Sequence, residues 1–119
     1  QQFLLGGSLS TVYRRCIAPY VESHPRCAYR ARRRENPSGW IVETMQAVLQ
    51  AVMHTDSFES CLIDVVNRGG DADTTGAIAG MLAGACYGLQ AIPPRWLKAL
   101  DPAVSAACRL QARSLVGLQ

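Results

Sequence analysis

Apolar side chains recur at helical spacing over residues 39–55, where they lie three or four positions apart. These apolar positions are Ile41, Val42, Met45, Val48, Leu49, Val52 and Met53. Such spacing places them on one face of an α-helix. Pro37 and Ser38 precede the pattern as an entry signal, because both residue types are common where helices begin. The pattern therefore predicts a helix over 39–55 with one buried face.

A second helix is predicted to begin at Asp56 or Ser57, because either side chain can accept a hydrogen bond from the first helical turn. Its inner face is expected to hold Phe58, Leu62, Val65 and Val66. Gly69 and Gly70 follow, and glycine commonly ends helices. A short helix closed by a glycine turn is the expected result.

Residues 74–94 carry no charged side chain, and a stretch of this length has to be considered as a membrane span. The stretch ends in two prolines and has glycine at every fourth position, so its hydrophobicity is low for a span. The glycines are Gly76, Gly80, Gly84 and Gly88. Each glycine costs about 1 kcal/mol of helix propensity, so the stripe indicates close approach of a neighbouring helix. We therefore expect no membrane span, and a helix buried on all sides in a bundle.

Proline marks two further helix starts near the end of the chain. Pro93 and Pro94 open a short amphipathic turn that carries Trp96 and Leu97, and Asp101 followed by proline is typical of an N-cap with proline at the first helical position. No stretch alternates apolar and polar residues as a strand would. The 119 residues, about half of them apolar, suffice for a single core. We therefore predict an all-α chain in which residues 1–119 form one domain.

The first third of the chain is expected to be less regular. Residues 3–21 are predicted to be helical with a break at Gly6 and Gly7, and residues 22–36 are predicted to form a polar loop. This loop holds five of the twelve basic residues: Arg26, Arg30, Arg32, Arg33 and Arg34. With Tyr29, such a run can neutralise the charge of nucleic acid or of a phosphate-bearing partner. The net charge is only +3, and we favour a solvated, mobile run and expect no nucleic-acid partner.

Five cysteines are widely spaced and form no C-x-x-C pair. They are Cys16, Cys27, Cys61, Cys86 and Cys108. We interpret them as reduced thiols, with Cys61 and Cys86 on apolar helical faces, where cysteine behaves as a small hydrophobe. Reduced thiols and the lack of a signal sequence at the start favour a cytoplasmic location. His24 and His54 are isolated and are expected at the surface.

Asp71 and Asp73 lie two residues apart behind a Gly-Gly pair, which lets the chain turn and approach a ligand closely. With Thr74 they offer oxygen ligands, which suit Mg²⁺, Mn²⁺ or Ca²⁺ better than Zn²⁺. The run from Asp71 imitates the start of an EF-hand loop, but Leu82 stands at its twelfth position, where glutamate is required. An ordinary calcium loop is therefore excluded. The alternative is that Asp71 only caps the following helix and Asp73 is a first-turn carboxylate favoured by the helix dipole.

The run Gly-Gly-Asp-Ala-Asp-Thr-Thr-Gly-Ala-Ile-Ala-Gly at residues 69–80 resembles the C-terminal metal-binding signature of the ADP-ribosylglycohydrolases. These all-helical enzymes remove ADP-ribose from modified side chains. The likeness continues through residues 38–46 and 92–97, and it is closest to the bacterial branch that reactivates dinitrogenase reductase. It implies the C-terminal portion of an orthogonal helical bundle, because the family's N-terminal aspartate cluster has no counterpart in this sequence.

The resemblance also implies roles for individual residues. Asp71, Asp73 and Thr74 would bind Mg²⁺ or Mn²⁺ in a two-metal centre, in which Asp73 reaches both ions and the two aspartates serve catalysis. The expected reaction is hydrolysis of ADP-ribose from arginine on a protein. Further carboxylates would come from the missing N-terminal portion, so the isolated chain is expected to be inactive. The alternative is a non-catalytic fragment that binds ADP-ribose or a partner protein through a degenerate half-site.

Trp40 is the second candidate that the resemblance singles out. The family commonly has an aromatic residue at this position, packed near the bound ADP-ribose. Ser38 and Gly39 would then let the ligand approach the backbone. The alternative for Trp40 is a core aromatic at a helix start. The implied partners are an ADP-ribosylated protein and the N-terminal portion of the same fold.

Overall fold

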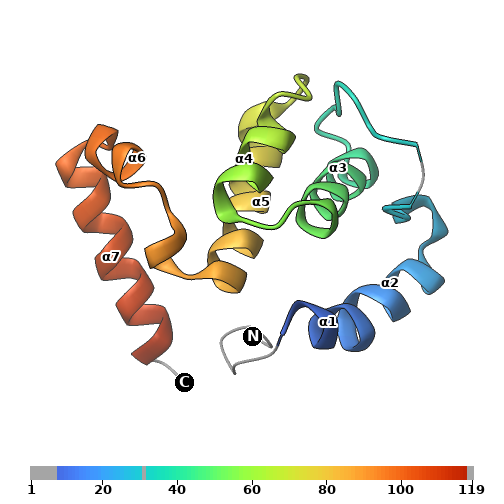
Figure 1. Cartoon of the computed structure of the whole chain (residues 1–119), viewed down its shortest axis with the longest axis horizontal. Coiled ribbons are helices and arrows are strands. Elements are labelled where there is room, and N and C mark those ends of the chain that lie inside the picture. Colours follow the sequence, from blue (N-terminus) through green and yellow to red (C-terminus); the bar gives the residue numbers. More distant parts are fainter. Residues whose placement is uncertain (1–7, 31, 118–119) are drawn as a thin grey trace.

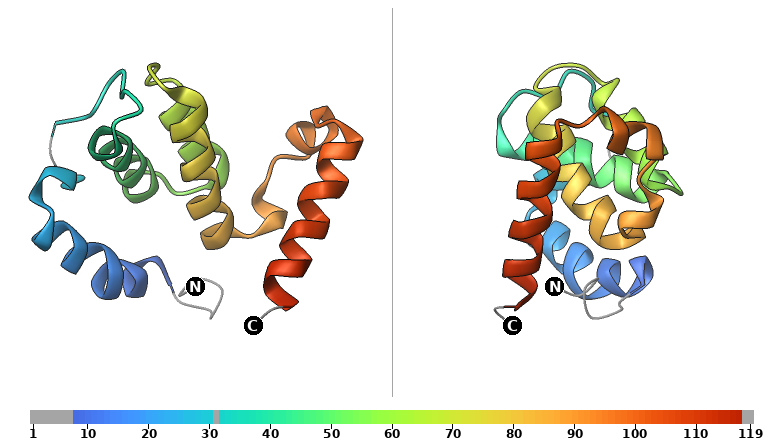
Figure 2. Two further views of the ribbon diagram at one scale, coloured as in Figure 1. Left: turned by 180° about the vertical axis from the view of Figure 1, so that it is seen from behind. Right: turned by 90° about the vertical axis from the view of Figure 1, so that its left-hand side faces the viewer.

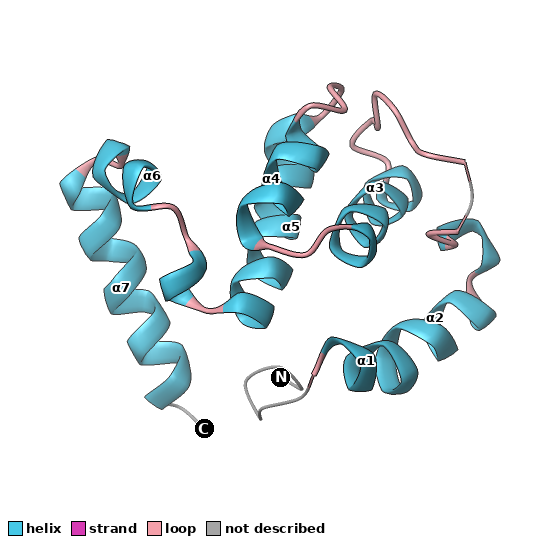
Figure 3. Ribbon diagram, viewed as in Figure 1, coloured by secondary structure: helices cyan, strands magenta, loops and turns pink. Residues whose placement is uncertain are grey.

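The computed structural model describes residues 8–30 and 32–117. Within those ranges all regular secondary structure is helical, and no strand is present (Figure 1, Figure 3). The predicted all-α class is therefore confirmed. In chain order the elements are α1 (Leu9–Val12), the π-helical turn η1 (Tyr13–Ile17), α2 (Ala18–Ser23), the 3₁₀ turn η2 (Pro25–Cys27), α3 (Ile41–His54), α4 (Phe58–Val66), α5 (Ala72–Tyr87), the 3₁₀ turn η3 (Leu89–Ala91), α6 (Pro94–Ala99) and α7 (Pro102–Gly117). Within the described ranges, no helix has both the length and the apolar character that a membrane crossing requires.

The core lies between α3, α4 and α5, which pack against one another at the centre of the molecule (Figure 1, Figure 2). Its buried side chains are Ala47, Val48, Ala51, Val52, Phe58, Cys61, Val65, Ala79 and Ala83. The ring of Phe58 meets Trp96 edge-to-face with the ring centroids 6.2 Å apart, which connects α6 to this core. Removing these apolar side chains from water is the main force that holds the three helices together.

Helices α3 and α4 confirm the two helical patterns. Helix α3 spans Ile41–His54. Of the apolar positions on its predicted inner face, Val48, Leu49 and Val52 are buried. Val42, Met45 and Met53 are partly buried, and Ile41 is exposed. Ser57 caps α4 in a capping box, in which its hydroxyl accepts from the backbone N–H of Ser60 and the Ser60 hydroxyl accepts from the backbone N–H of Ser57. Val66 differs from the prediction, because it is the last residue of α4 and is 45% exposed.

The glycines of α5 face α4, but the predicted close approach is met only at Gly76, since the contacts at Gly80 and Gly84 have ordinary distances. A Cβ atom on Gly76 would lie 3.3 Å from Cγ2 of Val66, and one on Gly80 would lie 3.8 Å from Cδ1 of Leu62. The prediction that this helix is buried on all sides is wrong, because Met81 is 66% exposed and Asp73 is also exposed. Helices α3 and α4 cover two sides of α5, and a further side of α5 faces outward in the described part of the molecule.

The N-terminal helical segment extends from Leu9 to Ser23, two residues beyond the predicted end. The predicted break at Gly6 and Gly7 lies outside the described residues. Among residues 24–30 and 32–40, the turn η2 is the sole helical element, which agrees with the predicted loop.

The arginine run in this loop is less solvated than predicted. Arg33 forms an ion pair with Asp64, and the backbone N–H of Arg34 donates to Oε1 of Gln50 at 2.9 Å. The Nε atom of Arg34 donates to Oε1 of Gln46 at 3.0 Å. Gln46 and Gln50 lie one turn apart on α3, so their amide groups present a row of partners to the passing chain. Part of the run is therefore bound to α3 and α4.

Both proline-marked helix starts are confirmed. Helix α6 begins at Pro94 and α7 begins at Pro102. Oδ1 of Asp101 accepts hydrogen bonds from the backbone N–H groups of Ala103 at 2.8 Å and Val104 at 3.1 Å, which is N-cap geometry. Helix α7 lies at one end of the molecule, and its described side chains are almost all exposed (Figure 1, Figure 2).

All five cysteines are free thiols, in agreement with the sequence interpretation. Cys61 is fully buried among the core helices, and Cys86 is partly buried. Burial raises the pKa of both thiols and disfavours their thiolate forms. His24 and His54 are exposed, as predicted.

Candidate functional site

Two loops meet at the start of α5 and place its first residues beside the start of α3. Gly69 and Gly70 have φ values of 73° and 63°, which residues with a side chain rarely adopt. This turn brings the backbone N–H of Asp71 to within 2.7 Å of the carbonyl oxygen of Pro37. The Pro37 side chain is fully buried under the turn. The segment that leads into α5 is therefore fixed on the segment that leads into α3.

The Asp71 carboxylate points toward the backbone of Gly39. A Cβ atom on Gly39 would lie 2.8 Å from Oδ2 of Asp71, closer than real Cβ atoms approach an oxygen. Asp71 occupies the N-cap position of α5, as the structural alternative expected, but its side chain accepts no capping hydrogen bond. Its carboxylate oxygens therefore remain free of the capping role.

Asp73 and Thr74 lie on the exposed first turn of α5. The pKa of Asp73 is lowered, first by a hydrogen bond with the Asp71 carboxyl group and then by the backbone N–H groups of Thr74 and of Asp73 itself. The side chains of Asp71 and Asp73 therefore lie within hydrogen-bonding reach of each other. The next residue, Thr75, is buried and donates its hydroxyl to the carbonyl oxygen of Asp71 at 2.9 Å, which braces the turn from inside.

Ser38 is held by a carboxylate that the sequence patterns did not single out. Its backbone N–H and its hydroxyl both donate to Oε2 of Glu43, at 2.9 and 2.7 Å. The serine hydroxyl, followed by the backbone N–H, lowers the pKa of Glu43. Glu43 lies in the first turn of α3, where a carboxylate can reach back to the residues before the helix. That position was the signal that could have identified it.

Trp40 is the N-cap residue of α3 and is 52% exposed. An indole exposed to this extent is not part of the core, so the core alternative for Trp40 is wrong. Its neighbour Gly39 is the residue that Asp71 contacts. The structure therefore brings the segment from Ser38 to Trp40 together with the segment from Asp71 to Thr74.

Asp71, Asp73 and Thr74 at the start of α5 offer oxygen atoms only, from two carboxylates and one hydroxyl. Such hard ligands fit Mg²⁺ or Mn²⁺, and the Asp71 carboxylate is not occupied in capping α5. Nowhere in residues 8–30 and 32–117 do three or more His, Cys, Asp or Glu side chains gather as a metal site would require.

These features, a helical bundle with an Asp-x-Asp-Thr segment at the start of a glycine-striped helix, define a class of protein, and comparison with known sequences identifies it. The model of the ADP-ribosylglycohydrolase family matches residues 5–118. The chain therefore belongs to the ADP-ribosylglycohydrolase family, as the sequence resemblance implied.

Individual members of the family also match this chain. The chain is 57% identical over 81 residues to the ADP-ribosyl-[dinitrogen reductase] glycohydrolase of Rhodospirillum rubrum, an alignment that covers 68% of this chain and 28% of that protein. It is 38% identical over 74 residues to the ADP-ribosylarginine hydrolase Tri1 of Serratia proteamaculans (strain 568), covering 60% of this chain and 20% of that protein. The chain thus spans less than a third of the length of these curated relatives.

Proposed function

We propose that this chain forms the C-terminal part of a hydrolase that removes ADP-ribose from ADP-ribosylated arginine on a protein. The observation that carries this proposal is the meeting of Asp71 and Gly39, which joins the metal-binding and substrate-binding candidates in a member of this family. The names of the relatives supply the substrate class, since one acts on ADP-ribosylarginine and one on dinitrogenase reductase. Reactivation of dinitrogenase reductase is the physiological role we propose.

Asp71, Asp73 and Thr74 would hold one side of a two-metal centre of Mg²⁺ or Mn²⁺. The bound ions would supply charge stabilisation and a water of lowered pKa. Asp71 and Asp73 are the catalytic candidates of this chain, because their carboxylates would contact the reacting groups most closely. Glu43 keeps Ser38 in place through two hydrogen bonds.

Trp40 and Gly39 would position the ADP-ribose. The exposed indole of Trp40 offers a flat surface on which an aromatic or sugar ring can stack. The missing side chain of Gly39 leaves the backbone beside Asp71 open to close approach. Holding the anomeric carbon near the metal ligands lowers the barrier by orientation, which contributes strongly to reactions of this kind.

The partial ligand set implies a further contributor. Two divalent ions prefer about six oxygen ligands each, and the three residues of this chain cannot satisfy both. We propose that the remaining carboxylates come from the family's N-terminal portion. The 119 residues alone would then bind metal weakly and would not turn over substrate. We also propose that the complete enzyme acts in the cytoplasm. We propose no nucleic-acid partner, and two of the five arginines of the loop, Arg33 and Arg34, form ion pairs with Asp64 and Glu43.

The competing function is a non-catalytic module that binds ADP-ribose or a partner protein. The specific observation in its favour is the lack of a third acidic, histidine or cysteine ligand near Asp71 and Asp73 among the described residues. Such a module would bind ADP-ribose without needing a second ion.

A metal count combined with a ligand titration separates the two functions. In a Trp96→Phe background, Trp40 is the remaining tryptophan, so its emission reports ligand binding at the start of α3. The hydrolase account predicts two Mn²⁺ ions per complex once the N-terminal portion of the Rhodospirillum rubrum relative is added, and Mn²⁺-dependent quenching by ADP-ribose. Metal-independent quenching with at most one weakly held ion supports the binding module and contradicts the hydrolase.

A further inference from the structure

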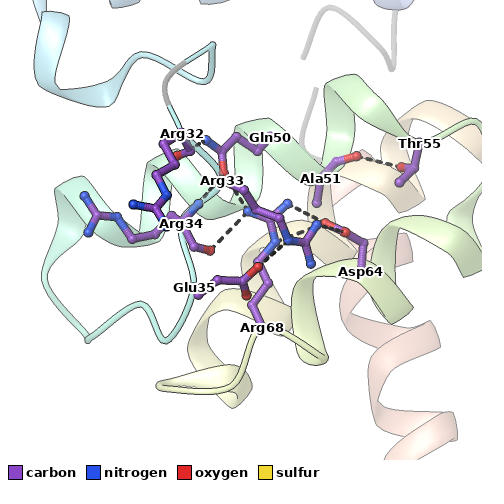
Figure 4. A network of polar contacts seen from close by, with 9 residues as sticks. All are labelled: Arg32, Arg33, Arg34, Glu35, Gln50, Ala51, Thr55, Asp64 and Arg68. Atoms are coloured by element: carbon purple, nitrogen blue, oxygen red, sulfur yellow. Dashed lines mark hydrogen bonds and ion pairs between the residues drawn. The ribbon is translucent and has the colours of Figure 1, made fainter.

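A buried arginine links three segments just before the metal-binding candidates. Arg68 is only 3% exposed, and its guanidinium group lies between Asp64 and the loop of residues 32–35 (Figure 4). Its Nε and NH2 atoms donate to Oδ2 of Asp64 at 3.0 and 2.5 Å. Its NH1 atom donates to Oε1 of Gln50 at 2.6 Å and to the carbonyl oxygen of Arg34 at 3.4 Å. The group thus connects α4, α3 and the loop.

Gln50 extends this connection along the loop backbone. Its Oε1 atom accepts from the backbone N–H of Arg34 at 2.9 Å as well as from Arg68. Its Nε2 atom donates to the carbonyl oxygen of Arg32 at 3.1 Å. Gln50 is itself buried, so these bonds form away from water, where leaving one unmade is costly. The loop backbone at residues 32–34 is therefore held by two buried side chains.

Two backbone hydrogen bonds carry this anchoring to the site. The carbonyl oxygen of Arg68 accepts from the N–H of Asn36 at 2.8 Å, and the carbonyl oxygen of Pro37 accepts from the N–H of Asp71 at 2.7 Å. Between them lies the turn of Gly69 and Gly70, whose positive φ values bring this segment into contact with Asn36 and Pro37. The loop that Arg68 holds therefore leads directly to Gly39, and Arg68 itself stands three residues before Asp71.

We propose that Arg68 is a positioning residue for the site, because its guanidinium group fixes the loop of residues 32–37 on α3 and α4 and so sets how Gly39 meets Asp71. This inference rests on the proposed function in one respect, namely that Asp71 binds metal. Arg68 donates hydrogen bonds from three separate nitrogen atoms. A lysine ammonium group has all its N–H bonds on one nitrogen atom, so it cannot reach the same widely spaced acceptors together. Residues that orient metal ligands in this way without touching the metal typically affect metal affinity by about 10- to 100-fold.

Hydrogen exchange tests the positioning role without any metal. In the Arg68→Met variant the amides of Asn36 and Asp71 should exchange at least about tenfold faster, while amides in the middle of α3, α4 and α5 keep their protection, because the loop opens locally. Arg33→Met is the matched control, since it removes the other arginine on Asp64 but leaves the bonds to Gln50 and Arg34 intact. Unchanged exchange at Asn36 and Asp71 in folded Arg68→Met overturns the inference, and so does equal opening in Arg33→Met.

A lysine variant covers the case in which Arg68→Met does not fold. Arg68→Lys keeps the charge beside Asp64 but cannot serve all three acceptors, so the same two amides should exchange faster than in the parent chain. Full retention of their protection in Arg68→Lys also overturns the inference.

Metal affinity then connects the loop to the site. With Mn²⁺ followed by electron paramagnetic resonance, folded Arg68→Met should bind at least about tenfold more weakly than the parent chain, whereas Arg33→Met should bind as the parent does. If Arg68→Met binds Mn²⁺ as tightly as the parent chain does, Arg68 does not position the metal-binding candidates. Absence of Mn²⁺ binding by the parent, alone and with the N-terminal portion of the relative, contradicts the proposed function instead, and the exchange experiment still decides the role of Arg68.

Discussion

Gly39 and Asp71 lie so close that a single methyl group would not fit between them, since a Cβ atom on Gly39 would come within 2.8 Å of Oδ2 of Asp71. The two residues are 32 positions apart in the sequence and precede different helices. Their contact joins the two segments into one candidate site. Because Gly39 has no side chain, adding one there tests whether the position of the Asp71 carboxylate matters.

Gly39→Ala should displace the Asp71 carboxylate and weaken Mn²⁺ binding by about tenfold, as expected when a ligand loses its orientation. Gly117→Ala is the control, because a Cβ atom there meets nothing within 4 Å. Mn²⁺ titration followed by electron paramagnetic resonance measures both. An affinity of Gly39→Ala equal to that of the parent would mean that the contact does not position a metal ligand.

Asp73→Ala should abolish metal binding and activity while leaving the helix content unchanged, because the side chain is exposed on the first turn of α5. Asp56→Ala is a matched control, since Asp56 is an exposed aspartate just before α4. Mn²⁺ affinity and far-ultraviolet circular dichroism together give the answer. Retained metal with full turnover in the complemented enzyme would remove Asp73 from the site.

Two substitutions of Gly80 should change stability in opposite directions. Gly80→Ala should stabilise the chain by up to about 1 kcal/mol through helix propensity, because its Cβ atom would lie at an ordinary 3.8 Å from Leu62. Gly80→Leu should destabilise it by about 1 to 3 kcal/mol through overpacking against α4. Urea unfolding measures both free energies. A stabilising Gly80→Leu would show that this face of α5 is not packed.

The free energy of unfolding should decrease in acid because Asp64 becomes protonated. Burial would raise the pKa of Asp64, but hydrogen bonds from Arg33 and Arg68 and their charges outweigh it and hold the pKa below its ordinary value. Because the unfolded chain has a higher value, about 3.9, this contribution is fully present above that pH and is lost as the pH falls through the folded value. The free energy of unfolding should therefore decrease below about pH 4, and less steeply in Asp64→Asn. Equal slopes for the parent and Asp64→Asn would contradict this.

The helices and the site differ in how far sequence reasoning could predict them. Apolar spacing identified α3 and α4 because each buries one continuous face, and the Asp-Pro pair identified the start of α7 because capping is local. The burial of Arg68 left no such pattern, since its partners Gln50 and Arg34 lie 18 and 34 residues away. Solvation of the arginine run was overestimated for the same reason.

Only the family resemblance singled out the residues before α3 and those at the start of α5 as candidates for one site. Periodicity alone places Trp40 at a helix start and cannot distinguish an exposed indole from a core one. The two-loop contact through Pro37 and the Gly-Gly turn depends on positive φ values that many glycine pairs could adopt. Glu43 was missed because glutamate is common in first helical turns, so its position there is only a weak signal.

Release of ADP-ribose from an ADP-ribosyl-arginine substrate in the presence of Mn²⁺ tests the central claim most directly. The purified 119-residue chain should release none, and addition of the N-terminal portion of the Rhodospirillum rubrum relative should restore turnover, which Asp73→Ala should again remove. Robust turnover by this chain alone would contradict the account, because it would mean that the three candidate ligands at the start of α5 suffice for the reaction.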